Sequence, residues 1–458
     1  MIHPIFSPSS IFFPGESSLE HYPFARYLPP YYFNSVTQLI DYQINRISAL
    51  QSAVILDPFG ASPFVDVEIA RGGFPVVVCC NNPINRLLME FFANPPSQEE
   101  LLPILAEIAG LKKGNVRLET FIRSLYQSVC NNCGSKVEVE YFVWEKTAND
   151  LIHHLSQKKY RCLACGQIGE YPISKADLEL LEKIPSIDIF EFEAANKVVS
   201  RNDSQWQTVL EAVRLHPPRA LYVLFTILNK IEDLSSNERK QKLLLALMLS
   251  IIDYANGLWP YPPRRYRPKQ LALSAQFIEH NLWFTLEKAI EHWIELNSTA
   301  KVIPVVYWPN TPKAGEISIF EGRIKELVKT NPNLEFPFIV TVLPRPNQAY
   351  WTLSAIWTGW LVGKNAVIPF KNVLQRKRYD WGWHCQALFS AFSEMVENKR
   401  SPMRIIALIE ENEPNFLAAS LIAGDQAGFE LYDYTQQTDT HRAQIGWSFP
   451  RNQDESTN

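Results

Sequence analysis

The sequence predicts an α/β fold whose mostly parallel β-sheet is built from two separated parts of the chain. A strand, a helix and a second strand are predicted within residues 53–80, which is the pattern of a βαβ unit. Strand candidates that alternate with helices return after residue 300. Between the two parts lie two Cys-x-x-Cys pairs and then a mostly helical stretch. We therefore expect one α/β domain that is interrupted by a cysteine-bearing insertion and a helical region.

Five segments follow from these patterns. They are residues 1–95 (an N-terminal arm and the first part of the α/β domain), 96–200 (the insertion), 201–300 (the helical region), 301–450 (the second part of the α/β domain) and 451–458 (a tail). The arm, residues 1–35, is rich in proline and aromatic residues, so we expect an extended segment that packs on the domain. The tail is polar and is expected to be disordered.

Apolar spacing defines the elements of the first part. A helix is predicted from about Val36, where apolar residues recur near helical spacing. The apolar stretches 53–56 and 75–80 predict two buried strands. Between them, residues 65–71 fit a helix that Gly72-Gly73 closes with a left-handed cap.

The same criteria define the remaining elements. We expect helices that include 220–225, 243–249, 350–361, 384–396 and 415–423, and strands at 301–307, 337–343, 403–409 and 429–432.

The composition is that of a globular chain. It has 458 residues, 46% of them hydrophobic, and a formal net charge of −4, which excludes a basic protein that coats nucleic acid. No apolar stretch reaches the ~18–20 residues that span a bilayer, and the first residues lack the pattern of a signal peptide. We expect a soluble, cytoplasmic protein with no membrane partner.

The two cysteine pairs predict a structural zinc site. They are Cys130, Cys133, Cys162 and Cys165, and a glycine follows each pair. Two such knuckles supply four thiolates in a closed tetrahedral site, with no position left for a catalytic water. Alternating residues after the first pair predict a hairpin between the knuckles, so that the ribbon covers about 126–172. Buried free thiols or a pair of redox dithiols remain the alternatives.

A second informative segment follows the first predicted strand. It reads Asp57-Pro58-Phe59-Gly60-Ala61-Ser62 and leads into a helix. A turn of small residues at the carboxyl end of a strand lets a ligand approach the backbone at the edge of a parallel sheet. The alternative is an ordinary strand-to-helix turn.

This segment, with Asn82-Pro83 after the next strand, resembles the cofactor motif of amino-group DNA methyltransferases, which methylate adenine N6 or cytosine N4. The chain is similar from about residue 20 to 450 to a branch of that family that carries a zinc ribbon, also through residues 261–268, 279–283 and 346–351. The resemblance implies a Rossmann-like, S-adenosylmethionine-dependent methyltransferase fold. It also implies that residues 57–62 and the position of Cys80 face S-adenosylmethionine.

The chain departs from the family at the cofactor. Ala61 and Pro63 stand where the family has glycines that allow backbone contact with the methionine part of the cofactor. Cys80 stands where the family has an acidic residue that accepts hydrogen bonds from both ribose hydroxyls. A thiol cannot replace that acceptor, so we expect weak cofactor binding or none.

The larger departure is at the catalytic motif. The family has Asp or Asn, then Pro-Pro and an aromatic residue, at the end of the fourth strand, where they hold the target amine and stack on the flipped base. Here the corresponding strand ends in Leu343-Pro344-Arg345-Pro346. Leucine accepts no hydrogen bond. Asn94-Pro95-Pro96 comes closest to the motif elsewhere, but it follows the second strand and lacks the aromatic residue.

Two basic segments predict contact with DNA. They contain Arg264, Arg265, Arg267 and Lys269, and Arg376 and Arg378, in each case among aromatic residues. Basic groups interleaved with aromatic rings suit phosphate contact and base stacking. The alternative is solvated loops that aromatic packing holds in place.

Two functions follow. The first is a degenerate, non-catalytic methyltransferase-like protein that binds nucleic acid or a protein partner. The second is an active S-adenosylmethionine-dependent DNA methyltransferase. The changes at Leu343, Cys80 and Ala61 favour the first.

Overall fold

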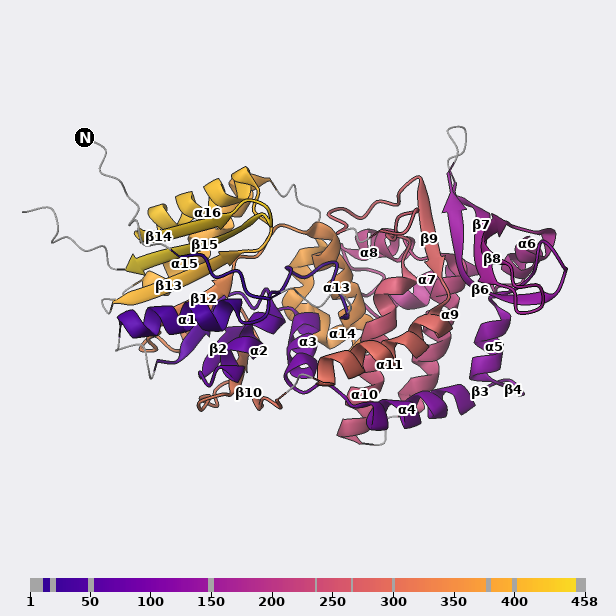
Figure 1. Cartoon of the computed structure of the whole chain (residues 1–458), viewed down its shortest axis with the longest axis horizontal. Helices are drawn as coiled ribbons and strands as arrows, with labels where there is room; N and C mark the ends of the chain where they lie inside the picture. Colours follow the sequence, from indigo (N-terminus) through magenta and orange to yellow (C-terminus); the bar gives the residue numbers. More distant parts are fainter. Residues whose placement is uncertain are drawn as a thin grey trace, which may run out of the picture.

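The computed structural model of the chain describes residues 11–16, 22–47, 53–146, 152–234, 237–264, 267–298, 301–375, 380–397 and 402–449. Three parts follow one another along the long axis in Figure 1. A sheet with its helices forms one end, a group of helices the middle, and a small antiparallel sheet the other end.

The large sheet has eight strands in the order β10-β11-β2-β1-β12-β13-β15-β14. From β10 to β13 all neighbours are parallel, whereas β15 is antiparallel to both β13 and β14. The sheet is therefore mostly parallel and combines both parts of the chain, as predicted. Its strands are β1 Ile55–Asp57, β2 Val76–Cys79, β10 Val305–Tyr307, β11 Ile317–Phe320, β12 Phe338–Val342, β13 Met403–Ile409, β14 Glu430–Gln437 and β15 Arg442–Phe449.

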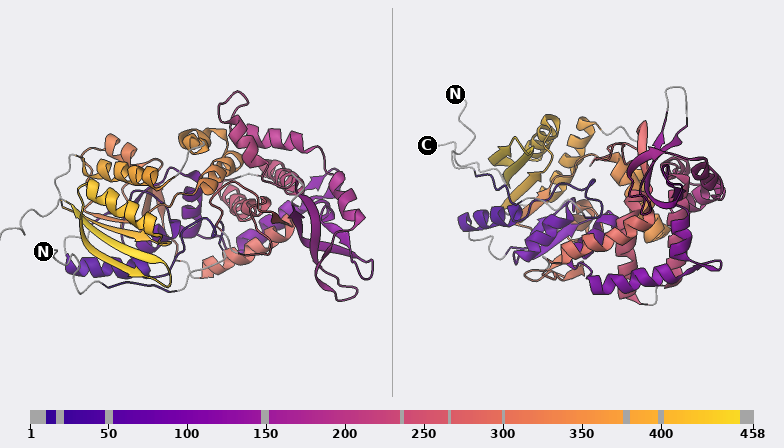
Figure 2. Two further views of the ribbon diagram at one scale, coloured as in Figure 1. Left: turned by 90° about the horizontal axis from the view of Figure 1, so that it is seen from above. Right: turned by 45° about the vertical axis from the view of Figure 1, so that its right-hand side comes forward.

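Helices cover both faces of this sheet, because its central strands are apolar on both sides. Ile55 and Val76 pack in one core, while their chain neighbours Leu56 and Val77 pack in a second core on the opposite face. In the left view of Figure 2 the orange and yellow helices lie above the strands and the indigo helix α1 below them. The helices are α1 Ser35–Arg46, α2 Pro63–Arg71 and α3 Pro83–Ala93 on the first face, and α12 Ile324–Thr330, α15 Trp381–Val396 and α16 Pro414–Gln426 on the second.

The left-handed cap predicted for the helix after β1 is present. Gly73 takes a φ of +91°, and the backbone N–H of Phe74 donates to the carbonyl of Ile69 at 3.3 Å. This bond closes the end of α2 and turns the chain into β2.

Two strands of the large sheet, β11 and β15, were not predicted. β11 is short and has Ser318 between apolar residues, so its sequence shows no clear run. β15 contains Gly446, where an added Cβ would meet the Tyr432 ring at 2.7 Å, so the glycine serves close packing against β14. In addition, the predicted strand 301–307 is shorter, since only Val305–Tyr307 pairs, and it forms the edge of the sheet.

The N-terminal arm packs on the α/β domain where it is described. The Tyr31 ring stacks on Phe64 of α2 with ring centroids 4.9 Å apart, and its hydroxyl donates to Glu68 at 2.6 Å. Arg26 forms a buried ion pair with Asp253 at 2.6 Å and so ties the arm to the helical region. The tail, residues 451–458, lies outside the described residues.

The middle part consists of helices that pack around a shared core. Both predicted apolar stretches, 220–225 and 243–249, lie inside helices, α9 and α10. The helices of this part are α4 Gln98–Gly110, α7 Ile187–Asn196, α8 Trp206–Val213, α9 Pro218–Ile231, α10 Glu238–Ile252, α11 Leu282–Ser298, α13 Gln348–Leu361 and α14 Lys364–Val367.

The small sheet is the predicted ribbon with one additional strand. β6 and β7 form the expected hairpin, and β9, which follows the helices in sequence, pairs with the other edge of β6. The elements here are β5 Gln127–Val129, β6 Lys136–Glu145, β7 His154–Arg161, β8 Ile168–Pro172, β9 Gln276–His280, α6 Lys175–Glu182, and, leading into them, β3 Lys112–Lys113, β4 Val116–Arg117 and α5 Leu118–Ser124.

Within the described part of the chain, no helix combines the length and the apolar character that crossing a membrane requires.

Candidate functional site

The two cysteine knuckles have matching backbone geometry. The N–H of Cys130 donates to the carbonyl of Ser135 at 2.8 Å, and that of Cys162 donates to Gln167 at 2.8 Å. Gly134 and Gly166, the glycines that follow the pairs, have φ values of +71° and +74°. A side chain is disfavoured in this left-handed region, which explains the glycine after each pair.

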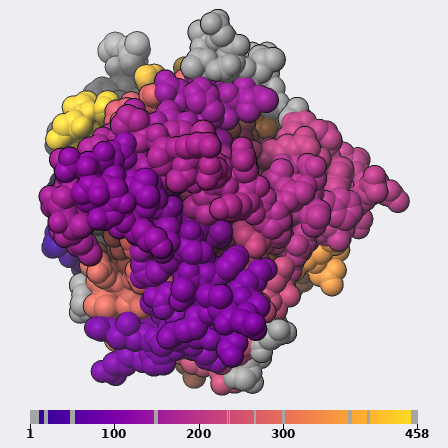
Figure 3. Space-filling model, turned by 90° about the vertical axis from the view of Figure 1, so that its right-hand side faces the viewer, coloured from indigo at the N-terminus to yellow at the C-terminus, as the bar shows by residue number. Residues whose placement is uncertain are grey.

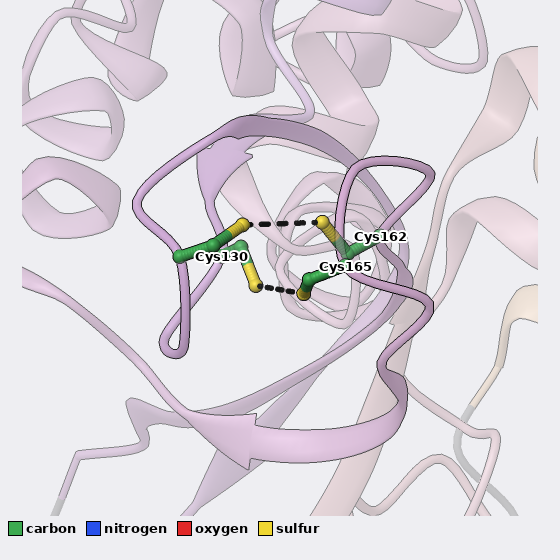
Figure 4. Close-up of side chains that lie close together, drawn as sticks. Cys130, Cys162 and Cys165 are labelled. Carbon is green, nitrogen blue, oxygen red and sulfur yellow. Dashed lines mark hydrogen bonds between the residues drawn. The ribbon is translucent and has the colours of Figure 1, made fainter.

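The four sulfurs form one cluster. All lie within 4.8 Å of one another, and the Cys130–Cys165 and Cys133–Cys162 Sγ distances are both 3.6 Å. Figure 4 shows the side chains of Cys130, Cys162 and Cys165 pointing toward one another. Sulfurs about 2.3 Å from a central zinc ion lie roughly 3.8 Å apart in a tetrahedron, so the cluster fits zinc.

The electrostatics of the knuckles suit a cation. The backbone N–H groups of Cys133 and Asn132 lower the pKa of Cys130 to about 6, which favours the thiolate. The pKa of Cys162 is raised to about 11 despite the N–H of Cys165, because burial and, after it, the neighbouring sulfurs favour the protonated form. A dication bound at the centre would replace those shared protons.

Buried polar contacts hold the ribbon around the cluster. The Tyr160 hydroxyl accepts from the Asn131 N–H at 2.8 Å. The Lys158 ammonium is fully buried, 2.8 Å from Asp177 of α6 and 2.6 Å from the Ser128 hydroxyl. These contacts link β5, β7 and α6 beside the cluster, in which Cys130 and Cys162 are buried and Cys133 and Cys165 are exposed.

The second site lies where the order of the strands reverses. β1 has β2 on one side and β12 on the other, and ligands of such sheets bind in the crevice at the carboxyl ends of these strands. Asp57 ends β1, is fully buried, and accepts from the Thr341 hydroxyl of β12 at 2.6 Å and from the Phe59 N–H at 2.9 Å. Asp57 thus joins the two strands beneath the crevice.

Gly60 is required in the loop that follows. It has a φ of +52°, and an added Cβ would lie 3.1 Å from the carbonyl of Cys79 and 3.0 Å from the Cβ of Cys80. Its carbonyl accepts from the Asn85 side chain at 3.0 Å. The loop therefore lies close against the end of β2.

A cavity of about 270 Å³ occupies the crevice. Among the residues of the predicted cofactor loop, Phe59 and Ala61 line it, while Asp57, Pro58, Gly60 and Ser62 are buried behind it. Five aromatic rings contribute to its walls. The polar lining comes from Asn81, Asn82, Asn85, Asn347, Arg267 and Arg345.

Cys80 is not part of this lining. It is 1% exposed, and burial raises its pKa to about 12. The next residue, Asn81, lines the cavity after the end of β2.

Leu343 also points away from the cavity. It is 2% exposed and packs in the core on the α12 and α15 face of the sheet, and its backbone N–H donates to Leu408 at 2.9 Å. The next two residues, Pro344 and Arg345, form the rim of the cavity. The Arg345 guanidinium is paired with Glu411 at 3.1 Å and also with Glu413.

The predicted DNA-contacting residues have different environments. Arg267 lies in the cavity wall, donates to the carbonyl of Tyr27 at 3.0 Å and pairs with Glu411. Lys269 is exposed and lies 3.3 Å from Glu413, and Arg264 is exposed. Arg265, Arg376 and Arg378 lie outside the described residues.

The sequence analysis did not single out the two carboxylates that pair with Arg267, Lys269 and Arg345. Glu411 and Glu413 lie two and four residues after the end of the predicted strand 403–409. The rule that carboxyl ends of parallel strands meet at one edge would have placed them beside Arg345.

A second buried acid lies beside Asp57. Asp66 of α2 is fully buried, and burial together with repulsion from Asp57 raises its pKa well above the usual range. Burial also raises the pKa of Asp57, against the effect of its hydrogen bonds from Thr341 and Phe59. The two carboxyl groups cannot both ionise at low cost, so Asp66 holds its proton.

Comparison of the chain with protein-family models, with curated proteins and with solved structures finds no match.

Proposed function

We propose that this chain is a nucleic-acid-binding protein that keeps the frame of an amino-group DNA methyltransferase and transfers no methyl group. The observation that carries the proposal is the end of β12. The position that would hold the target amine is Leu343, whose side chain packs in the core on the far face of the sheet.

The rim of the cavity reinforces this argument. An amine nucleophile needs a hydrogen-bond acceptor beside it, so that its lone pair is available to attack the methyl group. Arg345, which lies three residues after the end of β12 and lines the cavity, offers only donors, and Glu411 and Glu413 hold its guanidinium. A target amine would therefore meet a cation at this rim.

The cavity supports weak binding of S-adenosylmethionine at most. Among the described residues, no acid lines the cavity to accept from both ribose hydroxyls, and leaving such hydroxyls unpaired costs on the order of 1–3 kcal/mol. The aromatic walls and the loop at Gly60 still suit a flat, nucleoside-like group.

Charge at the mouth of the cavity supports contact with nucleic acid. The cations outnumber the carboxylates here. They are Arg267, Arg345 and Lys269, which pair with Glu411 and Glu413. A phosphate can share these cations without any catalytic residue. The zinc ribbon would stabilise the opposite end of the molecule as a closed centre of four cysteines.

DNA binding of the full chain tests the proposal. Fluorescence anisotropy with a labelled duplex of mixed sequence, titrated at several salt concentrations, should give an association constant that falls linearly with salt on a double-logarithmic plot. A chain that binds neither duplex nor single-stranded DNA at 50 mM salt would contradict it.

Calorimetry with S-adenosylmethionine tests the cofactor part. We expect a dissociation constant weaker than about 10 μM, which corresponds to roughly −7 kcal/mol. Asn81→Asp should tighten binding about tenfold, since it restores an acceptor at the cavity. Cys80→Asp, the matched control, should destabilise the fold without tightening binding, because its side chain is buried. Tight binding by the unmodified chain would overturn this part.

The active methyltransferase remains the second candidate. The observation in its favour is the cavity itself, which lies at the strand reversal where the cofactor of such a sheet is expected. A direct assay of methyl transfer decides between the two.

A further inference from the structure

A short basic hairpin directly precedes α5 in the chain. Strands β3 and β4 are joined by a two-residue turn, Gly114-Asn115, and Gly114 has the positive φ of +61° that the first position of a type II′ turn requires. Figure 1 shows the hairpin at the lower right, beyond the packed helices, and Figure 3 views this end of the molecule face on. An added Cβ on Gly114 would meet nothing within 4 Å, so the tip is surrounded by solvent.

The register of the hairpin places two cations on one face. Lys112 and Arg117 are direct cross-strand partners, while Lys113 and Val116 form the pair on the other face. Like charges directly opposite each other destabilise a strand pair, so this arrangement opposes formation of the hairpin. An anion bound between the two side chains would relieve the repulsion.

Neighbouring groups leave these two cations accessible. The Arg117 side chain is 62% exposed, and its ion pair with Glu119 is long, at 3.9 Å. Lys112 is exposed as well. By contrast, Lys113 lies over the Tyr222 ring, 5.6 Å from its centroid, which fixes the other face of the hairpin against α9.

We infer that the face formed by Lys112 and Arg117 is a contact for the phosphate backbone of DNA. The inference rests on the proposed nucleic-acid binding and assigns it to a surface outside the strand-end cavity. Two cations on one face of the hairpin can contact phosphates of one strand, because an ammonium and a guanidinium both donate to phosphate oxygens. No base is read by such a contact.

The test compares the salt dependence of DNA binding in three full-length proteins. The test variant is Lys112→Ala with Arg117→Ala. The control is Lys313→Ala with Lys329→Ala, which removes two exposed cations from the sheet end of the molecule. Each lost phosphate contact lowers the slope of log K against log salt by about 0.9, so the test variant should lose a slope of about 2 and bind roughly 10- to 100-fold more weakly at 0.1 M salt. The control should retain the slope of the unmodified chain.

The outcomes separate the two proposals. If the unmodified chain binds and the test variant keeps the same slope, the hairpin inference is overturned and the proposed function stands. If the control loses as much slope as the test variant, binding depends on total charge and the inference also fails. If the unmodified chain shows no salt-dependent binding, the proposed function fails and the inference fails with it. Thermal melts of all three proteins should agree, because the substituted side chains are exposed.

Discussion

At the residue scale, the direction of single side chains determines what the cavity can bind, since Asn81 lines it whereas Cys80 and Leu343 are buried. The loop of Asp57 and Gly60 was found from its composition and its place after a strand. Cys80 was found by counting back from Asn82-Pro83, and the count missed that Asn81 is the residue at the cavity. Successive residues of an extended chain point in opposite directions, so an error of one position exchanges a core residue for a lining residue.

The buried pair Asp57 and Asp66 makes a prediction about pH. The folded chain holds a proton on Asp66 that the unfolded chain releases above the usual Asp pKa of about 3.9. The free energy of unfolding should therefore fall as pH rises from that value toward the raised pKa. Asp66→Asn removes the ionisable group at nearly constant size. The free energy of unfolding of this variant should therefore fall less between pH 5 and pH 8 than that of the unmodified chain.

Urea unfolding at several pH values measures this dependence. Asp41→Asn serves as the control, because Asp41 is exposed on α1 and should leave the dependence unchanged. Equal slopes for the unmodified chain and Asp66→Asn would show that Asp66 is ionised in the folded protein.

At the scale of elements, long periodic segments were predictable and short buried ones were not. The predicted strand 403–409 matches β13, because the continuous apolar run 405–409 has few alternatives. β11 and β15 were not predicted because a serine and a glycine interrupt their apolar patterns. Tertiary packing determines whether such segments form strands. The ribbon was predicted from cysteine spacing, but β9, which completes its sheet, comes from more than a hundred residues later.

The ribbon predicts one zinc ion per chain. Metal analysis of protein purified without added metal should find about one equivalent, and Cys130→Ser with Cys162→Ser should reduce it below half. Loss of the metal should speed amide hydrogen exchange in β5 to β8 and leave β1 and β12 unchanged, because four thiolates hold the knuckles together.

The control for the metal is Cys385→Ser, since Cys385 lies on α15 outside the cluster. Its zinc content should equal that of the unmodified chain. If the double substitution leaves the zinc content per chain unchanged, the zinc is bound at another site.

At the scale of the whole molecule, the insertion is part of the main core rather than an appendage. One hydrophobic cluster extends from Val76 of the sheet through Leu247 of α10 to Phe142 of the ribbon. Composition and periodicity could predict that each segment has a buried face, but not which faces meet. That information depends on contacts between residues distant in sequence, such as β6 with β9.

The N-terminal arm is held to the helical region by a contact between residues distant in sequence, Arg26 and Asp253. Arg26 donates two hydrogen bonds to Asp253, at 2.8 and 2.6 Å, and both residues are buried. Arg26→Ala leaves Asp253 without its cation and should lower the free energy of unfolding by about 3–5 kcal/mol. Lys175→Ala, which breaks an exposed pair with Glu179, should change it by less than about 1 kcal/mol. Denaturant unfolding measures both, and similar small losses would contradict the assigned role of Arg26.

The most direct test of the central claim is a single assay for methyl transfer. The full chain is incubated with tritiated S-adenosylmethionine and with mixed-sequence DNA, single- and double-stranded, under salt conditions where DNA binding is measured in parallel. Because Leu343 is buried and Arg345 is a cation at the rim, we predict bound DNA with no label above that of a boiled control. Label that accumulates in the DNA with time would contradict the account and identify the chain as an active methyltransferase.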